Sequence, residues 1–219
     1  EYMDPESRYS NETASLAISA YLRSLITNRA PFQEFFKNKF LAPTMSDAEK
    51  EGALLFFGKA GCVRCHNGPS FGSMEFHALG VKDLKDQPES FATREFDKKY
   101  LGRGGFTQRE EDMYKFKVPH LYNLKGNNFY FHGSSKSSIR AVVEYFNEAI
   151  PENPEVPESQ ISHYFHPLNL TDEEIDKLTL FLEESLYDPE IERYVPEYLP
   201  SNNCFPNADP ISKMDLNCD

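Results

Sequence analysis

The sequence has no run of about 18 apolar residues, the length that an apolar helix needs to cross a bilayer. The chain as given is therefore predicted to contain no membrane span. Its first residues, Glu1 to Pro5, also lack the basic and apolar segments of a secretion signal. We expect any such signal to have been removed or to lie in sequence that precedes these residues.

Basic residues are scarce: 23 lysines and arginines stand against 35 aspartates and glutamates, giving a formal net charge of -12. An acidic surface repels phosphate backbones, so nucleic acid is not expected as a partner. The charge favours basic partners through long-range steering, although it also serves solubility alone. With 39% apolar residues, the 219-residue chain has enough to bury a core in one large domain or two small ones.

Only four cysteines are present, and they form two separated pairs. Cys204 and Cys218 lie in the tail from Pro200 to Asp219, which is rich in proline, asparagine and aspartate and has little capacity to bury a core of its own. A disulfide is most useful in such a segment, so a Cys204–Cys218 bond is predicted. No further cysteine or histidine pair stands nearby to complete a tetrahedral zinc site.

Hydrophobic periodicity and capping patterns predict a mostly helical chain without internal repeats. Two capping boxes, Ser46 with Glu49 and Thr171 with Glu174, mark the start of two helices. The predicted helices cover residues 13–27, 32–40, 48–57, 137–147 and 172–186.

The segment 32–40 carries phenylalanines at helical spacing, which are expected to pack in the core. Residues 67–105 are rich in glycine, aspartate and lysine without a sustained period, and are predicted to be a loop with a short β-ribbon. A loop of that length in a compact domain is usually functional, for example by enclosing a bound group. The predicted fold class is therefore all-α with long loops.

The chemistry is carried by Cys62, Cys65 and His66, which form the Cys-x-x-Cys-His signature of covalent c-type haem attachment. The spacing places two thiols on one turn of backbone to form thioethers with the porphyrin vinyl groups, and the adjacent imidazole then reaches the iron as the proximal ligand. The sequence thus predicts one covalent haem c and a redox or electron-transfer role. The fold is predicted to be a c-type cytochrome domain with a disulfide-stapled C-terminal tail.

Two other kinds of functional site use part of this motif. A thioredoxin-like redox pair is expected after a strand, whereas here the motif follows a capped helix, and a zinc half-site needs a second half that is absent. Neither explains His66. Because haem c is attached outside the reducing cytoplasm, the motif predicts a periplasmic or cell-surface, extracellular location, where a disulfide also persists.

Four segments in the same order resemble the bacterial dihaem cytochrome c peroxidase and MauG family. They are residues 57–69, 76–81, 116–123 and 130–134, and the helices at residues 17–25 and after residue 168 also resemble that family. The resemblance extends to about residue 187 and covers the C-terminal haem domain only. It implies three parts: N-terminal helices at residues 1–45 that link to a first haem domain, a cytochrome c haem domain at 46–187, and a C-terminal extension at 188–219.

Members of this family carry a first, peroxidatic haem with its own Cys-x-x-Cys-His motif, and commonly a tryptophan between the haems. This sequence contains neither a second motif nor a tryptophan. We therefore expect either a fragment or subunit of a dihaem enzyme, which the start of the chain favours, or a monohaem relative without a peroxide site.

The resemblance also implies a sixth iron ligand, methionine or tyrosine, from the helix after the Tyr-x-His segment. That position falls on Phe146, which cannot coordinate iron. Tyr145 and Met113 are the candidate substitutes, and an open site is the alternative. Tyr145 is preferred, since one residue of helix offset is about 1.5 Å of rise and 100° of rotation, which a local irregularity absorbs.

His132 matches the family's haem-pocket histidine, which lies near the porphyrin and is not an iron ligand there. His77 and His120 are expected to be ordinary loop or propionate-side residues. The family's calcium ion implies backbone carbonyl ligands at Asn127 and Phe129.

The implied function is that of a cytochrome c peroxidase-like oxidoreductase. Its electron-entry haem receives electrons from a donor cytochrome or cupredoxin and passes them to a second haem domain or subunit that reduces hydrogen peroxide. Two alternatives remain: a monohaem electron-transfer subunit of a periplasmic assembly without peroxidase activity, and MauG-like oxidation of a protein partner.

Overall fold

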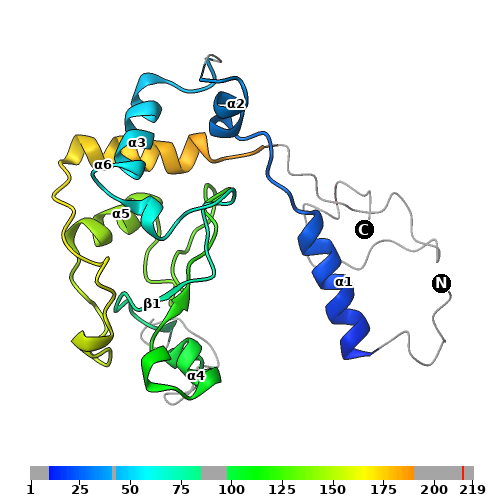
Figure 1. Ribbon diagram of the computed structural model, residues 1–219, viewed down its shortest axis with the longest axis vertical. Coiled ribbons are helices and arrows are strands. Elements are labelled where there is room, and N and C mark those ends of the chain that lie inside the picture. Colours follow the sequence, from blue (N-terminus) through cyan, green and yellow to red (C-terminus); the bar gives the residue numbers. More distant parts are fainter. Residues whose placement is uncertain (1–9, 41–42, 85–97, 190–213, 215–219) are drawn as a thin grey trace. The chain divides into compact units, whose positions relative to one another are not determined.

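The computed structural model describes residues 10–40, 43–84, 98–189 and 214 (Figure 1). The chain divides into two compact units, Thr27–Pro189 and a second formed by Glu1–Ile26 with Glu190–Asp219. The expected three-part division stays a prediction. Cys204 and Cys218 lie outside the described residues, so their disulfide stays a prediction as well.

Helix α1 (Asn11–Ser24) belongs to the second unit and is the helix predicted at residues 13–27. It begins earlier than predicted because Ser10 caps it: the Ser10 hydroxyl accepts a hydrogen bond from the Thr13 amide at 3.1 Å.

The unit Thr27–Pro189 contains the other helices of the described chain. They are α2 (Pro31–Lys37), α3 (Asp47–Phe57), α4 (Arg103–Thr107), α5 (Ile139–Glu148) and α6 (Asp172–Leu180), with a π-helical stretch at Phe181–Ser185 and 3₁₀ turns at Cys62–Arg64, Lys98–Leu101, Glu110–Asp112 and Glu158–Gln160. Both predicted capping boxes are confirmed: the Glu49 carboxylate accepts from the Ser46 amide and the Glu174 carboxylate from the Thr171 amide, each at 2.8 Å.

Helices α3 and α6 cross closely and form the centre of the core (Figure 1). Gly52 permits the approach, since a Cβ atom at this position would lie 2.1 Å from the Lys177 carbonyl oxygen. Phe56, Leu178 and Phe181 are fully buried around the crossing. This crossing fixes the end of α3, from which the cysteine motif leaves.

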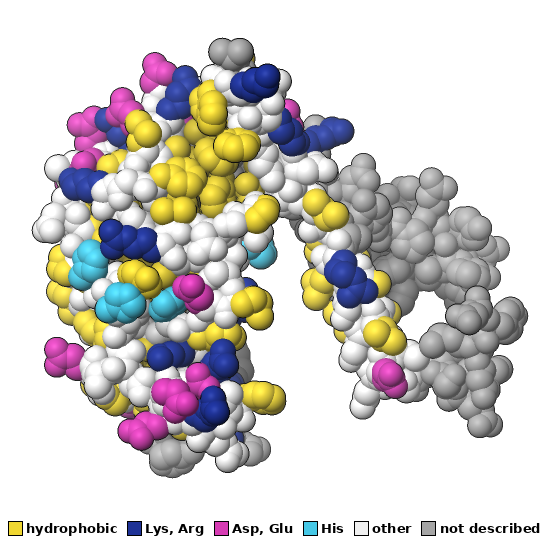
Figure 2. Space-filling view, viewed as in Figure 1, with side chains coloured by type: hydrophobic (Ala, Val, Ile, Leu, Met, Phe, Trp, Pro, Cys, Tyr) yellow, Lys and Arg dark blue, Asp and Glu magenta, His cyan; other side chains and the backbone are white. Residues whose placement is uncertain are grey.

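The phenylalanines of segment 32–40 divide between core and surface. Phe32 packs edge-on against Phe181, with ring centroids 5.4 Å apart, and Phe35 also packs on the core. Phe36 and Phe40 are 63% and 58% exposed, so their predicted core packing is wrong. Helix α2 ends at Lys37 and turns Phe40 outward through a positive φ of 66°. Figure 2 shows apolar side chains gathered on the surface over α2 and α3.

A two-stranded antiparallel sheet interrupts the all-α class. Strand β1 (Phe76–His77) pairs with β2 (Phe116–Lys117), with Phe76 opposite Lys117 and His77 opposite Phe116. The fold of the described residues is thus mostly helical with one small sheet. No helix among the described residues combines the length and apolar character needed to cross a bilayer.

Candidate functional site

The cysteine motif forms one tight helical turn at the end of α3. Gly61 enters it with a φ of 64°, a left-handed conformation that glycine adopts without strain. The Cys62 carbonyl then accepts hydrogen bonds from the amides of Cys65 at 3.2 Å and His66 at 2.9 Å. Two thiols and an imidazole are therefore held on one turn of backbone.

His66 presents a single free ring nitrogen. Its Nδ1 lies 3.0 Å from the Phe71 carbonyl oxygen and 3.1 Å from the Pro119 carbonyl oxygen. Because a carbonyl only accepts, Nδ1 carries the proton and Nε2 keeps its lone pair for a metal. Burial lowers the pKa of His66, which favours the neutral, metal-binding form.

Neither Cys62 nor Cys65 forms a disulfide. Burial raises the pKa of Cys62 to about 12 and raises the pKa of Cys65 as well. Redox-active cysteines instead have lowered pKa values, so these shifts do not favour a thioredoxin-like pair. The ligand atoms of Cys65, Glu75 and His77 lie within 4.8 Å of one another.

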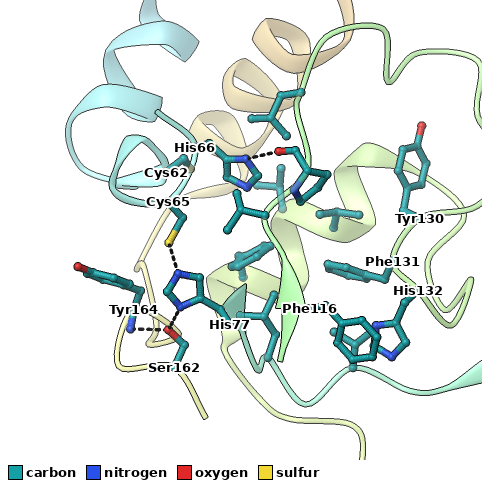
Figure 3. A pocket seen from close by; sticks show the side chains of 18 of the residues that line it. Cys62, Cys65, His66, His77, Phe116, Tyr130, Phe131, His132, Ser162 and Tyr164 are labelled. Carbon is teal, nitrogen blue, oxygen red and sulfur yellow. Dashed lines mark hydrogen bonds between the residues drawn. The ribbon is translucent and has the colours of Figure 1, made fainter. Parts of the chain in front are cut away.

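Cys62, Cys65 and His66 line a cavity of about 530 Å³ (Figure 3). Its walls are largely hydrocarbon and include Leu79, Val81, Val118, Leu121, Val142 and Phe146. A cavity of this size with mostly apolar walls suits a large apolar ligand.

The residues present fit a c-type haem. The macrocycle supplies the apolar bulk, the two thiols lie at the cavity for attachment, and the free nitrogen of His66 belongs to a common iron ligand.

His77 points toward Cys65 across this site, as Figure 3 shows. Its Nε2 lies 3.7 Å from the Cys65 sulfur and 3.2 Å from a Glu75 carboxylate oxygen, and its Nδ1 lies 3.0 Å from the Ser162 hydroxyl oxygen. The sequence did not single out His77 for this position. His77 lies on β1, and β1 pairs with β2, which precedes Pro119. This pairing brings His77 to the motif.

His132 lines the same cavity and lies beside Phe116, with their rings stacked at 3.6 Å between centroids (Figure 3). Its Nε2 lies 2.9 Å from a carboxylate oxygen of Asp83, which is 1% exposed and also lines the cavity. The other Asp83 oxygen accepts a hydrogen bond from the Asn153 side chain at 2.9 Å. A buried carboxylate thus holds the predicted pocket histidine in place.

No protein-family model matches the chain, but known proteins have similar sequences. The chain is 29% identical over 189 residues to the cytochrome-c peroxidase IdrP1 of Denitromonas iodatirespirans, covering 78% of this chain and 48% of that protein. It is 29% identical over 175 residues to the methylamine utilization protein MauG of Methylorubrum extorquens, covering 79% and 44%.

The chain is homologous to the dihaem cytochrome c peroxidases and MauG. Its fold is similar to that of the dihaem peroxidase BthA from Burkholderia thailandensis, with a TM-score of 0.68, 19% identity and coverage of 86% of this chain and 53% of that one. The chain spans about half the length of the relatives it matches.

The candidates for a sixth ligand in this dihaem peroxidase homologue do not line the cavity. Tyr145 is buried, and its hydroxyl donates to the Leu79 carbonyl oxygen at 2.7 Å. Burial also raises the pKa of Tyr145, which disfavours the phenolate that would bind ferric iron. Met113 packs against Gly104 in α4. Phe146, at the position where the family resemblance places the ligand, does line the cavity.

The two residues proposed for the family's calcium ion are exposed and do not themselves line the cavity, although Leu124 and Tyr130 on either side of them do. Among the described residues, the carbonyl oxygens of Asn127 and Phe129 accept no hydrogen bond. Phe129 as a whole residue is 67% exposed. The donor type suits calcium, which takes oxygen ligands.

Proposed function

We propose that this chain is the haem c domain of a cytochrome c peroxidase-like oxidoreductase and passes electrons toward the reduction of peroxide. The supporting observation is the meeting of Cys62, Cys65 and the free nitrogen of His66 at one apolar cavity. When bound, haem supplies an iron that changes its oxidation state by one electron.

The chain's own residues attach, orient and shield this group. Cys62 and Cys65 would hold it, and the carbonyls of Phe71 and Pro119 bind the Nδ1 atom of His66, so that Nε2 would be available to the iron. The hydrocarbon walls exclude water, which limits the reorganisation that accompanies a change of charge on the iron.

The full reaction needs partners that this chain does not supply. Reduction of hydrogen peroxide to two waters takes two electrons and two protons, and each donor molecule of the cytochrome or cupredoxin type delivers one electron. Peroxide would be cleaved at a second haem domain or subunit. The acidic surface, with its net charge of -12, would attract a basic donor.

The proposal also covers the bound groups: one haem c per chain and a calcium ion on the carbonyls of Asn127 and Phe129. It further includes a periplasmic or cell-surface location and the division of the chain into three parts at residues 45 and 187. Haem c is attached outside the reducing cytoplasm, where a C-terminal disulfide also persists, and this connects the proposed location to the chemistry.

The experiment measures two rates on protein that has been loaded with haem during periplasmic expression: reduction of the haem by a donor, and turnover of peroxide. Mixing with a reduced small cytochrome is expected to reduce the chain's haem rapidly, at a rate that falls with ionic strength because the surface is charged. Peroxide turnover is expected only when the second haem domain is present. A haem that no small donor reduces would contradict the proposal.

One observation favours a second candidate. The sequence given holds one Cys-x-x-Cys-His motif, which also fits a monohaem electron-transfer subunit without peroxidase activity. Rapid reduction by the donor without peroxide turnover in any native assembly would select this function. Oxidation of a protein partner by that assembly, with peroxide as oxidant, would select the MauG-like alternative.

A further inference from the structure

Residues of two hydrophobic clusters line the cavity. The first cluster contains Phe56 and Leu178, and Cys62 packs against it. The second contains Val81, and Phe146 packs against it. Helix α5 contributes to both, since its residues Ile139 and Val143 belong to the first.

The wall that α5 contributes is hydrocarbon throughout. The α5 side chains that line the cavity are Ile139, Val142, Val143 and Phe146. None of these has an atom that binds iron, and no methionine is among the cavity-lining residues of the described chain.

Several polar side chains that line the cavity have hydrogen-bond partners in the protein: Lys117 donates to the Val118 carbonyl oxygen and Tyr130 to the Leu124 carbonyl oxygen. His77 bonds at both ring nitrogens, to Cys65 and Glu75 on one side and Ser162 on the other. The His132 Nε2 is taken by Asp83.

The neighbouring Tyr145 is held away from this wall. Its hydroxyl is bonded to the Leu79 carbonyl at 2.7 Å, and its ring packs on Phe165 and Phe131 with centroids 5.1 and 5.6 Å apart. For the phenol to reach the cavity, this buried hydrogen bond would have to break. The end of α5 would also have to rotate so that Tyr145 takes the place of Phe146 in the packed wall.

We propose that α5 supplies no sixth ligand to the iron that His66 would bind, so that the haem of this chain would bind a small neutral ligand such as carbon monoxide. This inference rests on the proposed haem attachment. A hydrocarbon wall offers no charge or donor to an anion, which is why a neutral diatomic is the class of ligand it suits. The haem would then combine electron transfer with ligand binding.

The test uses the haem-loaded full chain, after denatured mass has confirmed covalent haem. The ferric absorption and electron paramagnetic resonance spectra are expected to be high-spin, and carbon monoxide is expected to shift the ferrous spectrum. Phe146→Met supplies an internal ligand, so the spectra should become low-spin. Carbon monoxide affinity should fall by about tenfold or more, because a site that is about 90% occupied internally leaves a tenth of the protein competent.

Phe165→Met is the matched control. Phe165 belongs to the same cluster but does not line the cavity, so this variant should keep the high-spin spectrum. If Phe146→Met does not fold, the wild-type spectra and carbon monoxide titration alone still decide.

A wild-type haem that is low-spin and does not bind carbon monoxide would overturn the inference. Loss of that low-spin signal in Tyr145→Phe or Met113→Leu would identify the ligand. Such a result leaves the proposed function standing, whereas a chain without covalent haem removes both.

Discussion

The Nδ1 atom of His66 lies 3.0 Å from the carbonyl oxygen of Phe71. This contact connects the motif to the loop that follows it and decides the tautomer of the imidazole. Phe71 itself is buried in the core, stacked on Tyr122 with ring centroids 5.6 Å apart. The nitrogen proposed to bind iron is thus oriented by the hydrophobic core of the domain.

Gly52→Ala is predicted to destabilise the crossing of α3 and α6. A Cβ at this position would lie 2.1 Å from the backbone oxygen of Lys177 and 2.8 Å from the Phe181 Cβ, so the two helices must move apart. Overpacking of this kind costs about 2–3 kcal/mol. Urea unfolding followed by circular dichroism measures the loss. Leu54→Ala, on the same helix at a 73% exposed position, should change stability little.

Asp83→Ala is predicted to loosen the wall that carries His132. The carboxylate accepts from His132 and from Asn153, and both groups would be left without this acceptor. The expected loss is on the order of 2–3 kcal/mol in the free energy of unfolding. Asp83→Asn keeps one acceptor oxygen and should lose less. Equal losses in the two variants would contradict a role for the hydrogen bonds.

Acid is predicted to weaken the start of α6 through Glu174. Its hydrogen bond to Lys59, at 2.6 Å, and the amide of Thr171 lower its pKa from the ordinary 4.5. A carboxyl with a lowered folded pKa stabilises the fold above its ordinary pKa, and this contribution is lost as pH falls below it.

The stability difference between wild type and Glu174→Gln should therefore shrink between about pH 6 and about pH 3 in thermal melts. Glu148→Gln, which removes no ion pair among the described residues, is the control. A difference that stays constant with pH would exclude this role.

Much of the helical fold is predictable from the sequence, because capping and periodicity depend on residues that are close in sequence. Ser46 and Thr171 cap α3 and α6 with neighbours three residues away, and the apolar period of α5 is regular. The exposure of Phe36 and Phe40 was not predictable, because periodicity says which side chains share a face and not how far the covering element extends.

The site residues also divide into those that the sequence predicts and those that depend on the tertiary fold. The motif residues are adjacent in sequence, so their meeting is predictable. The pairing of Asp83 with His132 spans 49 residues and that of His77 with Ser162 spans 85, and only the tertiary fold brings them together. The direction of Tyr145 depends on the Leu79 carbonyl, 66 residues away, which explains why a one-residue helix offset looked permissible from sequence.

A disulfide between Cys204 and Cys218, which lie outside the described residues, is predicted to close a loop of about 15 residues and to contribute on the order of 3 kcal/mol in the chain-entropy model. Thiol labelling of the unfolded, unreduced protein should find neither cysteine reactive. Labelling of both would show that the tail is not crosslinked.

The most direct test of the account is the mass of the denatured chain after expression in a compartment that attaches haem. We predict a mass increase of one haem that survives acidified organic solvent and disappears in Cys62→Ala/Cys65→Ala. His66→Ala should retain the mass increase while its spectrum changes, since His66 is proposed to bind the iron and not the vinyl groups. A wild-type chain of unmodified mass, or a haem that extracts into the solvent, would contradict the account.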